Sequence, residues 1–231
     1  MHIVPTLTVD STNITPEQLE NGYSLNLTTD GTCTTPDWTQ CGVISNTTSD
    51  TIINPVRSAR LVTRGKQLLK YGKIEVVAKM PKGDWLWPAI WMMPEDSIYG
   101  DWPRSGEIDI MESRGNAPSS GIGRNVVSGA LHWGPDTQLD QFSRTLGNNK
   151  LARADFSQAF HTFGMQWGPN YIFMYVDMEL KVQSTASSFP AAGSDLIANS
   201  KVYSSPLVPS TAICTVEASS AGWTTTAMGR R

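Results

Sequence analysis

Short runs in which apolar and polar residues alternate constrain the fold of this chain more than any other feature. In the run 73–80, Ile74 and Val76 fall on one face of an extended chain, whereas Lys73 and Glu75 fall on the other. Further strand-like runs, bounded by Gly and Pro, are found at 89–93, 106–112, 128–133, 160–167 and 171–177. Helical periodicity is almost missing from the sequence. The pattern therefore predicts an all-β sandwich.

Length and charge narrow the class of protein further. A chain of 231 residues fits one sandwich domain of ordinary size. The net charge of −3 and the lack of a basic run argue against binding to nucleic acid or to an anionic membrane. No apolar stretch approaches the roughly 18 residues of a spanning helix. The three His and three Cys residues show no zinc-like spacing, so we expect no metal. We also expect no cofactor and a monomeric protein.

The first 60 residues carry signs of an extracellular protein. Cys33 and Cys41 have a spacing that allows a small disulfide loop, whereas Cys214 is expected to have no partner. Three glycosylation sequons begin at Asn13, Asn26 and Asn46. No signal peptide is visible at the N-terminus, so we expect a secreted protein whose export signal is missing from this chain.

A local helix signal and a change of composition mark the two ends of the chain. Thr15, Pro16 and Gln18 form a capping-box pattern that predicts one or two helical turns, which Gly22 would end. About half of the residues from 183 to 231 are Ser, Thr or Ala, with little charge and no sustained alternation. This composition predicts a weakly structured tail with few strands.

The acidic residues of the run 106–113 are the strongest candidates for chemistry. On a regular strand Glu107 and Asp109 share a face, but Glu112 would point into the core, where an ionised carboxylate is costly. One extra residue, a β-bulge at Ile110–Met111, would return Glu112 to the face of the other two acids. Clustered carboxylates repel one another, so stability gives no reason for such an arrangement.

A close carboxylate pair does have a catalytic use, because one member can stay ionised while the pKa of the other is raised. Two carboxyl groups about 5–5.5 Å apart suit retaining hydrolysis of a glycosidic bond. In that reaction one carboxylate attacks the anomeric carbon, and the other, which donates the proton, is expected to titrate at the higher pH. Sugar rings also need flat apolar partners, and the sequence supplies Trp85, Trp87, Trp91 and Trp102 nearby. Trp91 could equally be a core residue, whereas Trp102 precedes the acidic strand in a loop-like stretch.

Several segments together resemble glycoside hydrolase family 16, the laminarinase-like endo-β-1,3-glucanases. The resemblance spans roughly residues 20–182 and is carried by the segments 58–60, 73–75, 80–92, 99–103, 105–116, 131–135 and 160–164. It implies a β-jelly-roll with a concave glucan-binding cleft and no catalytic metal. It also implies a polysaccharide substrate, a β-1,3- or mixed β-1,3/1,4-glucan, cleaved internally with retention.

The resemblance assigns roles residue by residue. Glu107 matches the family's nucleophile, Glu112 its acid/base, and Asp109 the helper between them. Trp91 and Trp102 fall where the family stacks sugars, and His132 falls on a strand that lines the cleft. Arg114 and Asn116 close the matched segment and are expected to bind substrate as well. By contrast, His161 lies between Phe160 and Phe163 and is expected to be structural.

Two departures from the family pattern lead to further expectations. The start of the chain resembles an internal strand, and the resemblance ends near Gln183. We therefore expect a catalytic domain at 1–182 that lacks its first strands, followed by a divergent tail at 183–231, and a sandwich that is incomplete. Two alternatives to the hydrolase stay open: a β-1,3-glucan-binding protein without a working acid pair, and a glucan transglycosylase that shares the covalent intermediate.

Overall fold

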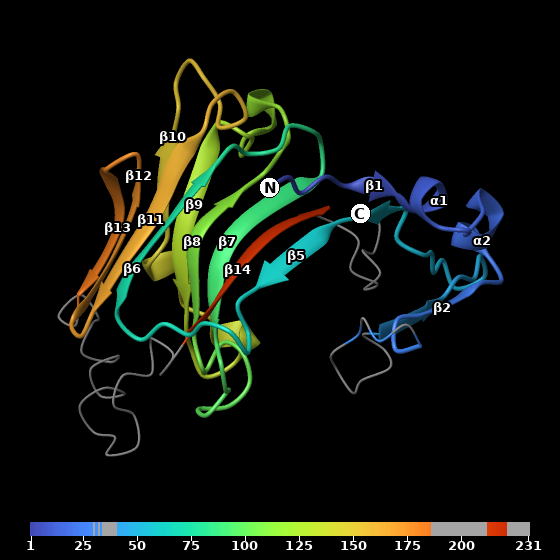
Figure 1. Ribbon diagram of the computed structural model, residues 1–231, viewed down its shortest axis with the longest axis horizontal. Helices are drawn as coiled ribbons and strands as arrows, with labels where there is room; N and C mark the ends of the chain where they lie inside the picture. Colours follow the sequence, from blue (N-terminus) through green and yellow to red (C-terminus); the bar gives the residue numbers. More distant parts are fainter. Residues whose placement is uncertain (30, 32, 34–40, 186–211, 221–231) are drawn as a thin grey trace. The chain divides into compact units, whose positions relative to one another are not determined.

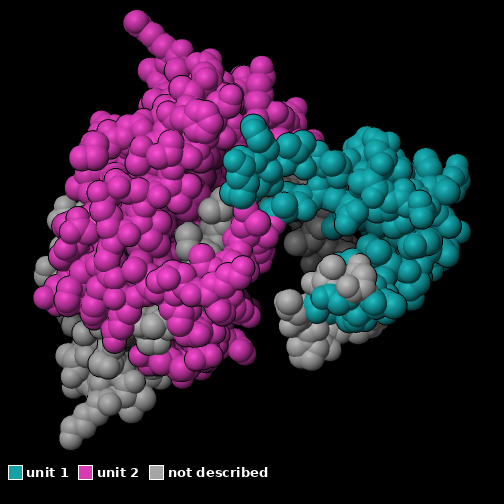
Figure 2. All heavy atoms as spheres, viewed as in Figure 1, with its two compact units in different colours: residues 1–59, 219–231 teal, residues 60–218 magenta. Residues whose placement is uncertain are grey.

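The computed structural model describes residues 1–29, 31, 33, 41–185 and 212–220, with the backbone alone at 182–185 and 212–220. The chain divides into two compact units, residues 1–59 with 219–231 and residues 60–218 (Figure 2). The second unit contains the strand runs that the sequence predicts, and it also contains all the candidate site residues.

The first unit consists of short elements tied by turns. They are β1 (Thr6–Leu7), α1 (Thr8–Ser11), α2 (Pro16–Glu20), β2 (Ser24–Asn26), β3 (Gly42–Ile44) and β4 (Val56–Arg57). The predicted capping box is present at the start of α2, where Thr15 and Gln18 exchange backbone and side-chain hydrogen bonds. The predicted disulfide joins Cys33 to Cys41, with 5.6 Å between their Cα atoms.

The second unit is a two-layer β-sandwich (Figure 1). A four-stranded sheet has the order β13-β12-β11-β6, and a six-stranded sheet has the order β10-β9-β8-β7-β14-β5. The strands are β5 (Ala59–Val62), β6 (Gly72–Ala78), β7 (Leu86–Pro94), β8 (Glu107–Ser113), β9 (Val126–His132), β10 (Gly147–Lys150), β11 (His161–Gly168), β12 (Tyr171–Val176), β13 (Glu179–Thr185) and β14 (Ala212–Ser220). Three 3₁₀ turns, η1 (Pro118–Ser120), η2 (Thr137–Leu139) and η3 (Phe142–Arg144), lie in the connections. Each strand run that the sequence predicts is confirmed.

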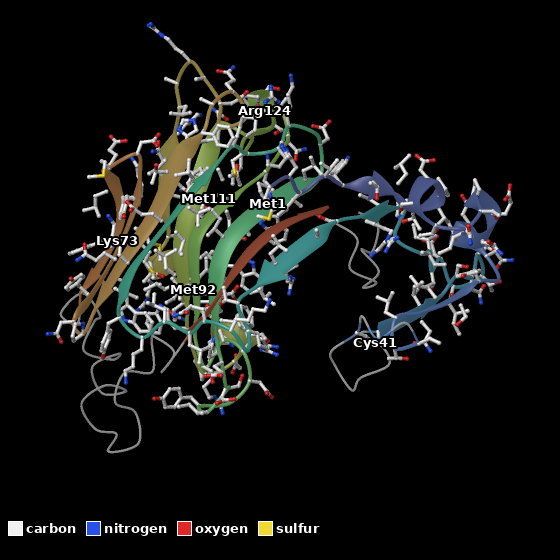
Figure 3. The ribbon with its side chains drawn as sticks, in the orientation of Figure 1. Met1, Cys41, Lys73, Met92, Met111 and Arg124 are labelled. Atoms are coloured by element: carbon white, nitrogen blue, oxygen red, sulfur yellow. A yellow bond between two sulfur atoms is a disulfide. The ribbon has the colours of Figure 1, made fainter. Side chains whose placement is uncertain are left out.

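The core lies between the two sheets and explains why the alternation is so regular. The six-stranded sheet contributes Ile90, Met92, Ile108 and Met111, each 1% exposed or less. Met92 and Met111, which are labelled in Figure 3, come from the neighbouring strands β7 and β8. The four-stranded sheet contributes Phe163, Met165 and Met174 from β11 and β12. Burial of these side chains fixes which face of each strand stays open, and the candidate site uses the open face of the six-stranded sheet.

The tail corrects one expectation drawn from the sequence. β13 continues to Thr185, and β14 lies between β7 and β5 within the six-stranded sheet. The expectation of few strands beyond residue 183 is therefore wrong at these two places. Composition averaged over the tail concealed the short run 212–220, and sheet neighbours can supply backbone hydrogen bonds to a strand whatever its side chains. The side chain of Cys214 lies outside the described residues.

One close packing contact stabilises the outer face of the four-stranded sheet. The ring of Tyr175 on β12 leans over Gly164 on β11, and its hydroxyl donates a 2.9 Å hydrogen bond to Glu75 on β6. A Cβ atom at position 164 would overlap this ring, so only glycine allows the contact. The tyrosine therefore links three strands across a glycine.

We predict that the effect of Gly164→Ala on stability changes sign with the residue at position 175. In the wild-type background the ring must leave its place, and the free energy of unfolding should fall by about 1–3 kcal/mol. With Tyr175→Ala the obstacle is gone, so the same change should raise stability by roughly 0.5–1 kcal/mol, since alanine loses less backbone entropy than glycine. Urea unfolding of the four proteins of this cycle measures both values. Equal effects in the two backgrounds would contradict the packing contact.

Candidate active site

A bulge in β8 sets the direction of the acidic side chains. Asp109 pairs with Ala130 of β9 and Glu112 pairs with Ser128, so two residues of β8 stand against one residue of β9 between these pairs. The pairing with β7 shifts at the same place. Ile110 and Met111 both turn into the core, being 3% and 1% exposed. The bulge predicted at Ile110–Met111 is confirmed, and it moves Glu112 out of the core.

Each of the two glutamates receives a hydrogen bond from an indole N–H. Trp102 Nε1 donates to Glu107 Oε2, and Trp87 Nε1 donates to Glu112 Oε1 over 2.8 Å. Trp102 lies in the loop before β8, and Trp87 lies on β7. Both glutamates are half-buried, and the negative charge of Asp109 acts on both of them. The fold therefore brings the three acids together.

Burial makes both glutamates weak acids. Burial, and then the negative charge of Asp109, raise the pKa of Glu107 to about 7, against the lowering effects of Trp102 and His132. The same two causes raise the pKa of Glu112, while the positive charge of Arg114 and the bond from Trp87 oppose the rise. The order in which the two glutamates titrate in the free site stays a prediction, with Glu112, the expected proton donor, above Glu107.

His132 on β9 carries the positive charge of the site. Its Nε2 lies 3.0 Å from Asp109 Oδ2, and its Nδ1 lies 2.6 Å from Asp140 Oδ2. Burial acts to lower the pKa of His132, but the two carboxylates outweigh it and raise the pKa to about 9. Asp109 Oδ2 is buried and accepts no well-directed hydrogen bond, so its contact with His132 is one of charge with charge.

Aromatic rings surround the acids on the open face. Trp91 lies opposite Asp109 on the neighbouring strand, with the Arg60 guanidinium 5.0 Å above its ring. The ring of Trp102 lies 5.3 Å from that of His132 and is 36% exposed. Trp91 therefore lies on the face of the acids rather than in the core, since its neighbours Ile90 and Met92 fill the core side.

The two remaining candidates, Arg114 and Asn116, differ in their contacts with the acids. Arg114 lies 4.0 Å above the ring of Trp87, close enough to influence Glu112. Asn116 instead accepts a hydrogen bond from the backbone N–H of Trp85 over 3.3 Å, and no described contact joins it to the acids. Trp85 itself is 65% exposed. The structure thus places Arg114 beside the acids and gives Asn116 a contact that holds a loop.

The sequence offered Trp87 as a flat partner for a sugar but did not pair it with Glu112, although strand alternation puts it on the same face as Trp91. One residue of the site, Asp140, was missed. Asp140 carried no signal, since it lies in an irregular segment and reaches His132 only through the turn that follows β9.

The described part of the chain contains no group of three or more His, Cys, Asp or Glu side chains arranged to hold a metal ion. It also contains no helix with the length and apolar character needed to cross a membrane.

The fold and the site define an open-faced jelly-roll sandwich with a carboxyl cluster on its six-stranded sheet. The model of the glycosyl hydrolases family 16 matches residues 13–213, and the chain belongs to this family. The match begins before and ends beyond the 20–182 span on which the sequence resemblance rests.

Relatives of known name include both glucan-binding proteins and glucanases. A β-1,3-glucan-binding protein of Penaeus monodon is 44% identical over 148 residues, 63% of this chain and 40% of that protein. A glucan endo-1,3-beta-glucosidase of Cryptopygus antarcticus is 43% identical over 130 residues, 54% of this chain and 44% of that protein. The chain thus spans about two fifths of the length of these relatives.

Solved structures agree on the fold. The laminarinase catalytic domain of Thermotoga maritima superposes with a TM-score of 0.59 at 28% identity, covering 78% of this chain and 64% of that one. The laminarinase of Rhodothermus marinus gives a TM-score of 0.57 at 28% identity, covering 73% and 62%. The predicted jelly-roll sandwich is confirmed.

The raised pKa of Glu107 predicts a dependence of stability on pH. A carboxyl group that titrates near 4.5 when unfolded and about 7 when folded stabilises the fold below pH 4.5. This contribution is lost as the pH rises through 7. Glu107→Gln cannot ionise, so it should gain stability over the wild type by on the order of 2 kcal/mol between pH 4 and 8.

Urea unfolding at the two pH values measures this difference. Asp84→Asn, which alters an exposed carboxylate in the loop before β7, is the control and should show a much smaller change. A pH-independent difference between Glu107→Gln and the wild type would show that Glu107 is ionised at little cost in the folded protein.

Proposed function

We propose that this chain is a retaining endo-glucanase that cleaves β-1,3- or mixed β-1,3/1,4-glucan. The observation that carries the proposal is the β8 bulge, which brings Glu107 and Glu112 to one face with raised pKa values. Two carboxyl groups that share a proton near neutral pH can divide the roles of nucleophile and acid.

In the first step, the ionised Glu107 attacks the anomeric carbon while the protonated Glu112 donates its proton to the glycosidic oxygen. The bond between that oxygen and the anomeric carbon breaks, and the sugar becomes an ester of Glu107. In the second step, Glu112 takes a proton from water, and the oxygen of this water displaces Glu107. The anomeric configuration is inverted twice and therefore retained.

Neighbouring residues supply the charges that this cycle needs. Asp109 keeps a negative charge beside Glu112 and raises its pKa, which favours the acid form. Asp109 raises the pKa of Glu107 as well, and His132 lowers the pKa of both glutamates, which favours the ionised form that a nucleophile needs. Arg114 acts against the acid form of Glu112 until substrate excludes water and changes the balance.

The substrate assignment rests on rings and on relatives. Trp91 and Trp102 lie beside the acids, where each ring can pack against the C–H face of a sugar. The named relatives act on or bind 1,3-linked β-glucan. A neutral polysaccharide also suits a site whose cation, His132, is already paired by carboxylates. We place the polymer along the open face of the six-stranded sheet.

A glucan-binding protein is the second candidate, because a relative named for glucan binding is 44% identical to this chain. Both Glu107 and Glu112 are present, and the charge of Glu112 acts on Glu107, which favours the enzyme over the glucan-binding protein. A transglycosylase would use the same two carboxyl groups and differ in its products, because a sugar hydroxyl would replace water in the second step.

Secretion is part of the proposal and rests on the first unit. The disulfide Cys33–Cys41 suits an oxidising compartment. The sequon residues Asn13, Asn26 and Asn46 are all exposed, so each can carry a glycan without disturbing the fold.

The first functional prediction separates binding from cleavage. Glu107→Gln should reduce the release of reducing sugar from laminarin by at least about 10³-fold, since an amide is a poor nucleophile. Its affinity for laminarin should stay within about threefold of the wild type, because the amide keeps the shape of the carboxyl group. Binding with no hydrolysis by the wild type would instead favour the glucan-binding protein.

The second functional prediction identifies the acid. Glu112→Gln should lose activity on laminarin but recover much of it on aryl glycosides whose leaving groups need no proton. Proton NMR of the first product formed by the wild type should show the β-anomer, as retention requires. A first product with the α-configuration would exclude the covalent route through Glu107.

A further inference from the structure

Hydrogen bonds hold the segment between β9 and β10 beside the end of β9. Asp136 caps η2 by accepting hydrogen bonds from the backbone N–H groups of Gln138 and Leu139. The backbone N–H of Gln141 bonds to the carbonyl of Trp133 over 2.8 Å. The hydroxyl of Thr145 donates to the carbonyl of Leu131. These bonds give the segment a fixed place beside the end of β9.

Asp140 lies at the centre of this segment with its side chain only 9% exposed. Its Oδ1 accepts hydrogen bonds from the backbone N–H groups of Trp133 and Phe142, each over 3.2 Å. Its Oδ2 lies 2.6 Å from His132 Nδ1. The Phe142 ring stacks on the imidazole with centroids 5.2 Å apart and planes 21° apart. Asp140 and Phe142 therefore fix both the edge and the face of His132.

We propose that Asp140 is a positioning residue for the acid pair, which acts by holding His132 as a cation whose Nε2 lies 3.0 Å from the carboxylate of Asp109. The proposal rests on the retaining mechanism for its catalytic consequence but not for its structural part. A proton on Nδ1 is held by Asp140, so the second ring nitrogen is free to carry its own proton toward Asp109. Without Asp140 the ring would need only one proton, and the charge facing Asp109 would be lost.

Several carboxyl groups surround His132 and respond to its charge. Asp109 and Glu107 of β8 and Asp140 of the β9–β10 segment face the imidazole, and Glu112 also feels its charge. The cation lowers the pKa of Glu107 and of Glu112. Loss of the cation near neutral pH would therefore make the pair hold its proton more tightly. It would also move that proton toward Glu107, where it blocks the nucleophile.

The test begins with a titration that does not depend on activity. Proton–nitrogen NMR of the imidazoles is practicable because the chain has only three His residues. Asp140→Asn should lower the pH midpoint of His132 by about 2.5 pH units, to near pH 6.5, since an opposite charge in contact shifts a pKa by about 1–3 units. Asp136→Asn, in the same segment but away from the imidazole, should leave the midpoint unchanged. An unchanged midpoint in Asp140→Asn overturns the proposal whatever the enzyme does.

The kinetic arm separates positioning from simple loss of structure. For Asp140→Asn, kcat/KM on laminarin should equal that of the wild type near pH 5, where His132 is protonated in both proteins. Near pH 7.5 it should fall roughly tenfold, and the alkaline limb should move to higher pH. His132→Gln, which removes the cation but keeps the segment, should give the same neutral-pH loss.

A uniform fall at all pH values in Asp140→Asn would assign Asp140 a structural role and overturn the catalytic part of the proposal. If neither the wild type nor Asp136→Asn hydrolyses laminarin while the His132 midpoint still moves, the proposed hydrolase fails and the positioning contact stands. These outcomes keep the two proposals distinguishable.

Discussion

The arrangement of the open face depends on one extra residue in β8. A strand has a side-chain period of two, so residues 107, 109 and 112 cannot share a face while the strand stays regular. The register shift between Asp109 and Glu112 resolves this conflict, and it does so by sending both Ile110 and Met111 into the core. Core packing thus stabilises a local irregularity that the sheet alone would not favour. The stability of the sandwich and the geometry of the acids depend on the same two apolar side chains.

The bulge also brings carboxyl groups close together, and neighbouring residues offset their charge. Burial, and then the negative charge of Asp109, raise the pKa of both Glu107 and Glu112. His132 contacts Asp109 and Arg114 lies over Trp87, so both bring positive charge to the acids, and the two indole N–H groups donate hydrogen bonds to Glu107 and Glu112. Trp102 and Trp87 serve twice in this arrangement. The N–H edge of each orients a carboxyl group, while its ring supplies apolar surface near the place where a sugar would lie.

The sequence predicted those features that follow from local periodicity. Alternation located the strands, and the misfit of Glu112 with that alternation located the bulge, because an ionised side chain could not stay in the core. The same reasoning failed for β14, where a Ser/Thr/Ala-rich composition hid a strand whose partners, β7 and β5, are far away in the sequence. It also failed for Asp140. Nothing in an irregular segment indicates that its carboxylate will meet His132, because that contact depends on the path of the turn after β9. Asn116 was expected from its place in a motif to bind substrate; its Oδ1 accepts a hydrogen bond from the backbone N–H of Trp85, and its substrate role stays a prediction.

The contacts of His132 suggest why a buried cation is useful in such a site. Burial acts to pull the imidazole toward its neutral form. Contact with Asp109, and then with Asp140, outweighs burial and raises the pKa of His132 to about 9, above that of Glu107 at about 7. The charge on the imidazole is then constant while the acid pair exchanges its proton. Because the charge of the imidazole does not change in that pH range, the difference between the two glutamates is set by their own surroundings. Trp102 donates a hydrogen bond to Glu107, whereas Trp87 and Arg114 act on Glu112.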